Sequence, residues 1–150
     1  MKLRVGIVDD EFLARQTLVN YIARYCSNVE VLFQASNLPD AITEINRHRP
    51  DAVFLDIEMP GPSGIDIADH LSEEYRPMVV FTTAYGEYAV DAFGIRAVDY
   101  LLKPVEVARL KEAVERLREQ LKPSSTQDAV LNVSTLYGNK IVPIEEILYL

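Results

Sequence analysis

The first 121 residues alternate between short apolar runs and longer amphipathic stretches. The apolar runs predict five strands, at Leu3–Val8, Val29–Ala35, Ala52–Leu55, Met78–Thr82 and Val98–Leu101. Unbroken apolar runs such as Val53-Phe54-Leu55 are typical of strands that are buried on both faces.

Between these runs the apolar residues recur three or four positions apart, which is the spacing of one helical face. Helices are expected at Phe12–Tyr25, Leu38–His48, Ile65–Glu74, Tyr85–Phe93 and Val105–Leu121. The inward positions of the first are expected to be Phe12, Leu18, Val19, Ile22 and Tyr25. Asn37 is a candidate N-cap for the second. Strands alternating with helices over short connections predict an α/β fold with a parallel sheet covered on both faces.

The last expected helix carries an apolar stripe with two interpretations. Its members are Val107, Leu110, Val114, Leu117 and Leu121. Such a stripe packs a helix onto a sheet, and it is also the pattern of a coiled-coil seam between two chains. Packing onto the sheet is the favoured interpretation.

The composition changes after residue 121. Residues 122–129 begin with Lys-Pro-Ser-Ser-Thr-Gln and are expected to be a linker. Residues 130–150 alternate apolar and polar positions around a turn at Gly138-Asn139, which predicts a hairpin. So short a β-rich tail is too small for a core of its own, so we interpret it as the start of a second domain. The first domain is then residues 1–121.

Composition narrows the functional classes. The net charge of -8 disfavours tight nucleic-acid binding by the bulk of the surface. The single cysteine, Cys26, excludes an internal disulfide. No apolar run approaches the roughly 20 residues of a membrane helix, and the N-terminus lacks a signal-peptide pattern. We therefore expect a cytoplasmic protein without a membrane partner.

Polar residues follow the strands where a parallel sheet binds its ligands, at the carboxyl ends. Asp9 and Asp10 follow the first strand, and Asp56 follows the third. Thr82 and Thr83 end the fourth, and Lys103 comes shortly after the fifth. We expect these side chains to converge on one edge of the sheet.

This set of groups suits phosphoryl chemistry. Three adjacent carboxylates repel one another unless a cation binds between them, and hard oxygen ligands suit Mg²⁺. A lysine and a hydroxyl can stabilise a phosphoryl group, while a carboxylate such as Asp56 can act as its nucleophile and form an acyl phosphate.

Each residue also has a plainer interpretation. Asp9 and Asp10 are suited to capping the helix that follows. Lys103 alone would be a surface lysine, and Tyr100 alone a half-buried residue of the sheet. Thr82 is interpreted as structural, and Thr83 as the better candidate for the site.

Four motifs together resemble a bacterial response-regulator receiver domain. They are Val8-Asp9-Asp10-Glu11, Leu55-Asp56-Ile57-Glu58-Met59-Pro60, Thr83-Ala84 and Asp99-Tyr100-Leu101-Leu102-Lys103-Pro104. The resemblance covers residues 1 to about 121 in the same order and spacing. It implies a flavodoxin-like (CheY-like) doubly wound five-stranded parallel sheet of order 2-1-3-4-5.

The resemblance assigns roles to the acidic residues. Asp56 would be the phosphoacceptor. Asp10, Asp56 and the backbone carbonyl of Glu58 would ligate Mg²⁺ directly, and Asp9 would act mainly through water.

It also assigns roles to the residues around them. Thr83 would hydrogen-bond the phosphoryl group, and Lys103 would pair with Asp56 and then with the phosphate. Tyr100 would be the switch aromatic that follows Thr83. The Lys103-Pro104 peptide bond would be cis.

The implied partner is a sensor histidine kinase that donates the phosphoryl group. The chain would be a switch rather than an enzyme, with only self-catalysed phosphotransfer and slow autodephosphorylation. Phosphorylation would favour a homodimer through the surface formed by residues 85–93, 98–101 and 105–121.

The tail is similar to the beginning of a LytTR DNA-binding domain. The resemblance rests on Leu131-Asn132-Val133, Tyr137-Gly138-Asn139-Lys140 and Ile144-Glu145-Glu146-Ile147-Leu148-Tyr149-Leu150. The DNA-reading positions of that family would lie beyond Leu150. The resemblance therefore implies a transcriptional output only through a complete LytTR domain.

Two other functions remain open. Phosphatases of the haloacid dehalogenase type also use an aspartyl nucleophile with Mg²⁺, but they carry Asp-x-Asp-x-Thr where this chain has Asp56-Ile57-Glu58-Met59-Pro60. A degenerate receiver that acts only as an interaction module would lack an acidic residue, Thr83 or Lys103, and this chain has all of them.

Overall fold

The computed structural model describes residues 2–59, 76–84 and 97–121. Met1–Arg118 forms one compact unit. The helices expected at 65–74 and 85–93, the linker and the β-rich tail all lie outside the described residues and stay predictions.

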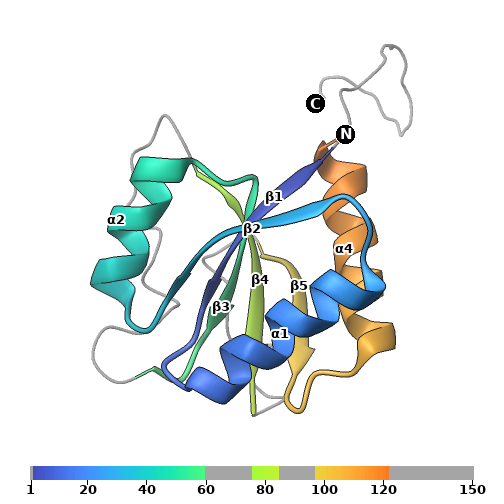
Figure 1. The fold of residues 1–150 in the computed structure, drawn as a ribbon, viewed down its shortest axis with the longest axis horizontal. Helices are drawn as coiled ribbons and strands as arrows, with labels where there is room; N and C mark the ends of the chain where they lie inside the picture. The colour runs from blue at the N-terminus through green and yellow to red at the C-terminus, as the bar shows by residue number, and fades with distance from the viewer. Residues whose placement is uncertain (1, 60–75, 85–96, 122–150) are drawn as a thin grey trace. The chain divides into compact units, whose positions relative to one another are not determined.

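Five parallel strands form the sheet, in the order β2-β1-β3-β4-β5 (Figure 1). They are β1 (Leu3–Val8), β2 (Val29–Ala35), β3 (Ala52–Asp56), β4 (Met78–Thr83) and β5 (Ala97–Leu102). All five expected strands are confirmed, and three of them run one or two residues longer than predicted. The sheet has the order of a flavodoxin-like fold, which confirms the expected fold class.

Helices lie on both faces of this sheet (Figure 1). They are α1 (Phe12–Tyr25), α2 (Leu38–His48) and α4 (Val107–Leu121). Helix α2 packs with alternate residues of the central strands, such as Val53 and Leu55. Figure 1 shows α1 and α4 on the opposite side. The side chains at the intervening positions of the strands, Ile7 and Phe54 among them, are fully buried as well. Burial on both faces explains why the strands are continuously apolar.

The ends of α2 and α4 follow from local chemistry. The Asn37 side chain accepts a hydrogen bond of 2.8 Å from the backbone N–H of Asp40, so the predicted N-cap is confirmed. Helix α4 begins at Val107, two residues later than predicted. Its first backbone hydrogen bond runs from Leu110 N to the carbonyl of Glu106, which leaves Pro104 and Val105 in the preceding loop.

Two of the inward positions expected for α1 are wrong. Leu18 and Ile22 are buried, but 61% of Phe12 and 45% of Tyr25 are exposed. Phe12 lies in the first turn, about 120° around a helix from Leu18, so it is off the buried face. Tyr25 is the last residue of α1, where its ring meets Tyr21 edge-on with centroids 6.1 Å apart and lies 5.9 Å from the Arg24 guanidinium carbon.

The apolar stripe of α4 packs inside a single chain. Leu110, Val114 and Leu117 are at most 2% exposed without any second chain present. That burial supports packing onto the sheet over a coiled-coil seam. None of the described helices has the length and apolarity needed to cross a membrane.

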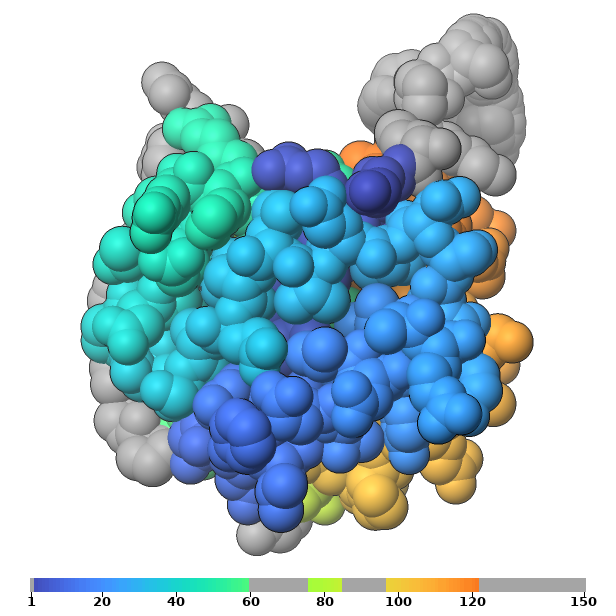
Figure 2. Space-filling view, in the orientation of Figure 1, coloured from blue at the N-terminus to red at the C-terminus, as the bar shows by residue number. Residues whose placement is uncertain are grey.

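Strand β2 forms one edge of the sheet and reaches the surface between α1 and α2 (Figure 2). It pairs with β1 through a register shift between Val5 and Gly6. At this point Gly6 lies opposite Phe33, whose ring stacks on His48 with 5.8 Å between ring centroids. A side chain on residue 6 would overlap the Phe33 ring.

We therefore expect Gly6→Ala to lower the free energy of unfolding by about 1–3 kcal/mol, because the added methyl group forces Phe33 out of place. Urea unfolding of the single variants and of the double variant with Phe33→Leu measures this effect. The smaller side chain should reduce the cost of the Gly6 substitution. An equal cost in both backgrounds would contradict the explanation.

Candidate functional site

An acidic cluster lies at the carboxyl ends of β1 and β3. These two strands are hydrogen-bonded neighbours, with Val8 paired with Leu55, so the residues that follow come together. Asp9, Asp10 and Asp56 each offer a carboxylate oxygen, and these three oxygens lie within 4.8 Å of one another. Asp9 and Asp56 are almost fully buried, whereas Asp10 is exposed. The predicted convergence of these carboxylates is confirmed.

Lys103 binds two members of the cluster. Its Nζ lies 2.9 Å from Asp9 Oδ2 and 3.3 Å from Asp56 Oδ2. Its backbone N–H donates to the carbonyl of Thr83 at 2.7 Å, and the Lys103-Pro104 bond is cis as expected. Burial alone would lower the pKa of Lys103, but contacts with the two carboxylates outweigh this and raise the pKa. Lys103 is therefore a partly buried cation of the site and not a free surface lysine.

The chemistry of Asp56 is set mainly by its burial. Loss of solvation raises the pKa of its carboxyl group to about 6, against the hydrogen bond from Glu58 N that lowers it. The nearby charge of Asp9 raises the same pKa, and the charge of Lys103 lowers it. The ionised form of Asp56 is therefore electrostatically destabilised at neutral pH, and an additional cation would stabilise it.

Asp9 combines a local structural role with a buried carboxylate oxygen that has no aligned hydrogen bond. Its Oδ1 accepts from the backbone N–H of Glu11 at 2.9 Å. Glu11 occupies the N-cap position of α1 and makes no capping bond through its own side chain. Asp9 Oδ2 is buried without an aligned hydrogen bond, although Lys103 Nζ is near. An incompletely satisfied carboxylate oxygen beside two other carboxylates fits the donor set of a small divalent cation.

Strand β4 brings two donors to the same edge. Thr83 is 2% exposed, and its hydroxyl donates to Glu58 Oε2. The backbone N–H of Ala84 donates to Glu58 Oε1 at 3.1 Å. The sequence pointed to the backbone carbonyl of Glu58 and did not reveal this role of its side chain. Thr82 is buried and its carbonyl accepts from Ile57 N, in agreement with a structural role.

The switch candidate Tyr100 lies on β5, next to β4. Its half-buried ring stacks on Phe81 with centroids 5.8 Å apart, and burial raises the pKa of its hydroxyl group. The preceding residue, Asp99, is buried and belongs to an ion cluster. The sequence did not predict this cluster. Its carboxylate binds Arg109 at 3.0 Å and Arg116 at 2.6 Å. The only sequence signal was an acidic residue inside an otherwise apolar strand.

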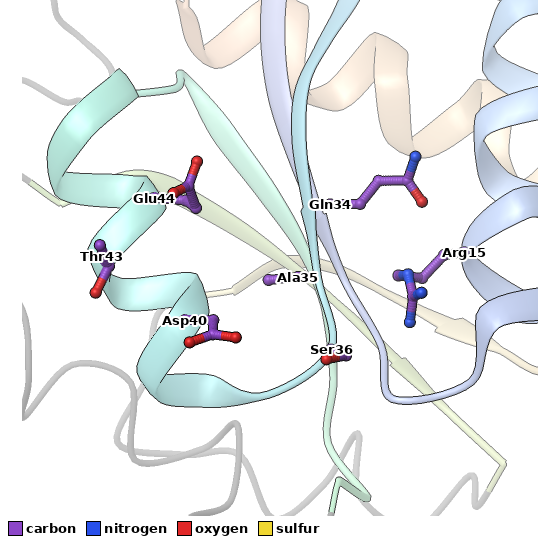
Figure 3. A pocket seen from close by; sticks show the side chains of 7 residues that line it. All are labelled: Arg15, Gln34, Ala35, Ser36, Asp40, Thr43 and Glu44. Atoms are coloured by element: carbon purple, nitrogen blue, oxygen red, sulfur yellow. The ribbon is translucent and has the colours of Figure 1, made fainter.

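The described residues line one hollow that borders the acidic cluster and another that contains none of its members. One, of about 560 Å³, lies between the first turns of α1 and the loop after β5, with Leu13, Tyr21 and Pro104 on its apolar wall and Asp9 and Lys103 on its polar wall. The other, of about 310 Å³, is polar and lies between α1, β2 and α2 (Figure 3).

The charges of the second hollow already have protein partners. Arg15 donates to the carbonyl of Asp9, Asp40 accepts from the Asn37 side chain, and Glu44 pairs with His48. This hollow offers no unsatisfied charged group to a ligand.

Residues 5–115 match the family model of the response regulator receiver domain. This chain belongs to that family. The chain is 41% identical, over 94% of its length, to the transcriptional regulatory protein BtsR of Escherichia coli strain K12. It is 44% identical, again over 94% of its length, to an uncharacterized response regulatory protein of Vibrio cholerae. The chain spans 57% and 62% of the length of these two relatives.

Solved receivers share the fold. The structural alignment with the response regulatory domain of mrkE from Klebsiella pneumoniae covers 79% of this chain and 97% of the mrkE domain. Its TM-score is 0.68 and the sequence identity is 33%. The receiver domain of AraT from Geobacillus stearothermophilus matches 81% of this chain and 96% of its own, with a TM-score of 0.71 and 33% identity. Receiver domains bind Mg²⁺ at an acidic pocket, which is where this receiver places Asp9, Asp10 and Asp56.

The raised pKa of Asp56 predicts how stability depends on pH. The pKa of Asp56 is about 6 in the folded state and 3.8 in the unfolded state. Between pH 3.8 and pH 6 the folded state therefore binds more protons than the unfolded state. The free energy of unfolding falls as the pH rises through this window. At pH values above this window, ionisation of Asp56 lowers the free energy of unfolding by up to about 3 kcal/mol. Asp56→Asn should therefore stabilise the chain, and the gain should grow from about pH 4 to about pH 6 and level off at higher pH.

Urea unfolding with a chelator present measures this difference, and Glu30→Gln at an exposed position of β2 is the control for loss of one charge. A pH-independent difference between wild type and Asp56→Asn would contradict the assigned pKa.

Proposed function

We propose that this chain is a phosphoacceptor switch, in which Asp56 takes a phosphoryl group from a sensor histidine kinase. One observation carries the proposal. Lys103 Nζ bridges two buried carboxylates, Asp9 and Asp56, at the edge of the sheet where Asp10 and Thr83 also lie. Burying two acids beside a partly buried lysine costs free energy, so such a cluster is typical of a functional site.

Mg²⁺ is the proposed cofactor. Asp10, Asp56 and the backbone carbonyl of Glu58 would hold it directly, with Asp9 acting mainly through water. The incompletely satisfied Oδ2 of buried Asp9 and the exposure of Asp10 support this assignment. When bound, the cation neutralises negative charge on the carboxylates and on the incoming phosphoryl group.

The residues of the chain supply the remaining functions. Asp56 presents a carboxylate as the nucleophile. The Lys103 Nζ is already 3.3 Å from Asp56 Oδ2. After phosphorylation it would pair with the phosphoryl oxygens. Thr83 would donate its hydroxyl to the phosphoryl group, and its movement would release the Tyr100 ring to turn inward.

The position of Tyr100 supports this coupling. Strands β4 and β5 pair Phe81 with Tyr100, so a displacement at the end of β4 reaches its ring directly. The backbone bond from Lys103 N to Thr83 O joins the ends of the same strands. The surface that responds would be the proposed dimer face, whose described part comprises β5 and α4.

The proposed output is control of transcription through a LytTR DNA-binding domain, in a protein longer than this chain. The alignment with BtsR, which is described as a transcriptional regulatory protein, covers 141 residues and so continues well beyond Leu121. DNA binding would require the complete second domain. A cytoplasmic location accords with this proposal.

Neither alternative function is favoured by the site. A haloacid dehalogenase-type phosphatase needs a second acid two residues after the nucleophile that is available for proton transfer. Here Glu58 occupies that position, and its carboxylate accepts from Thr83 and Ala84. A degenerate receiver would lack part of the cluster, whereas all of its expected members are in place.

Mg²⁺ should raise the melting temperature of the wild-type chain, because a ligand that binds only the folded state stabilises it. Asp10→Asn should lose most of this increase, and Glu30→Gln at an exposed position of β2 should retain it. Thermal unfolding with MgCl₂ and with chelator measures the effect. An increase of equal size in Asp10→Asn would contradict the assigned cation site.

A small-molecule phosphodonor, acetyl phosphate, should add one phosphoryl group to the wild-type chain in the presence of Mg²⁺ and none in the presence of chelator. Asp56→Ala should remain unlabelled, because the nucleophile is absent. Intact-mass spectrometry measures the product. Labelling of Asp56→Ala at the wild-type rate would contradict the proposed function.

A further inference from the structure

Glu58 contacts both sides of the phosphorylation site. Its backbone N–H donates to Asp56 Oδ1 at 3.0 Å. Its side chain reaches the neighbouring strand end, where the Thr83 hydroxyl and the Ala84 N–H donate to the two oxygens of its carboxylate. One residue therefore connects the phosphoacceptor with two hydrogen-bond donors at the end of β4.

Those two donors lie where an anion attached to Asp56 needs them. Asp56 pairs with Thr82 in the sheet register, so Thr83 and Ala84 follow directly beside the acceptor. A hydroxyl and a backbone N–H that converge on two oxygens of one anion can bind a carboxylate or a phosphoryl group equally well, since both present acceptor oxygens. In this structure the anion that they hold is the side chain of Glu58.

Within the described part of the chain, no cationic side chain forms an ion pair with the Glu58 carboxylate. Among the ion pairs of the described residues, none includes Glu58, and the Lys103 ammonium contacts Asp9 and Asp56 instead. Glu58 is also partly exposed, so its side chain has an open path to water. A phosphoryl group carries more charge than a carboxylate and would lie nearer to Lys103, so it should compete effectively for the same donors.

We propose that the Glu58 carboxylate is an internal competitor of the phosphoryl group. It occupies the Thr83 and Ala84 donors while Asp56 is unmodified, and it must leave them when the phosphoryl group arrives. Glu58 thereby favours the unphosphorylated state and slows phosphorylation. This inference rests on the proposed function, in which Asp56 is the phosphoacceptor.

The transfer step itself does not change Glu58 chemically. An oxygen of Asp56 forms a bond to phosphorus, and the bond between phosphorus and the leaving group of the donor breaks, with the electron pair going to that group. Glu58 neither gains nor loses a proton. Its role is to position and to block the donors, so it is a positioning residue and not a catalytic one.

The test compares initial labelling rates with acetyl phosphate at saturating Mg²⁺, together with the affinity for the phosphoryl mimic beryllofluoride. Glu58→Ala should raise both several-fold, because the Glu58 carboxylate no longer competes for the Thr83 and Ala84 donors. Glu58→Gln should raise both by less, because a neutral amide oxygen still accepts from them. Glu11→Gln is the matched control, since it removes one nearby negative charge and leaves the Thr83 and Ala84 bonds intact.

A double-mutant cycle with Thr83→Ala separates competition from general charge effects. The gain from Glu58→Ala should shrink in the Thr83→Ala background, where one of the two contested donors is already missing. Equal or slower labelling of Glu58→Ala, or a gain no larger than that of Glu11→Gln, would overturn the inference. Should Glu58→Ala fold poorly, Glu58→Gln carries the same comparison. Absence of labelling in wild type and all variants would instead refute the proposed function.

Discussion

The contact of Lys103 with Asp9 and Asp56 is the interaction on which the site depends. Without the Lys103 ammonium, two buried carboxylates would face each other at the end of adjacent strands. Uncompensated buried charges are strongly destabilising, so the lysine makes this acidic edge compatible with folding. The same cation is then in place for a phosphoryl group, and its backbone bond to Thr83 joins the site to the neighbouring strands.

A chain of contacts leads from this cluster to the surface. Thr83 ends β4, Phe81 on the same strand stacks on Tyr100, and Asp99 beside Tyr100 binds two arginines of α4. Arg109 also donates to the carbonyl of Tyr100 at 3.0 Å. The proposed switch therefore has a physical route from the phosphoacceptor to β5 and α4. In the unmodified chain Glu58 holds the first member of that route.

The sequence predicted the sheet and the central residues well because both follow from strand order. Once the strands are parallel, the residues after them must meet at one edge, as Asp9, Asp56 and Lys103 do. Helical periodicity could not show where α1 leaves the buried surface, so Phe12 and Tyr25 were misplaced. The Glu58 contacts and the Asp99 ion cluster depend on side-chain rotamers and on how α4 packs, which spacing alone does not encode.

The central claim is that this edge of the sheet carries a phosphoryl group on Asp56. Borohydride reduction of the labelled chain tests it most directly, because it converts a phosphorylated aspartate to homoserine, which peptide mass spectrometry can locate. Homoserine is expected at position 56, with unmodified aspartate at positions 9 and 10. Homoserine at position 9 or 10, or at none of the three in a chain that has gained a phosphoryl group, would contradict it.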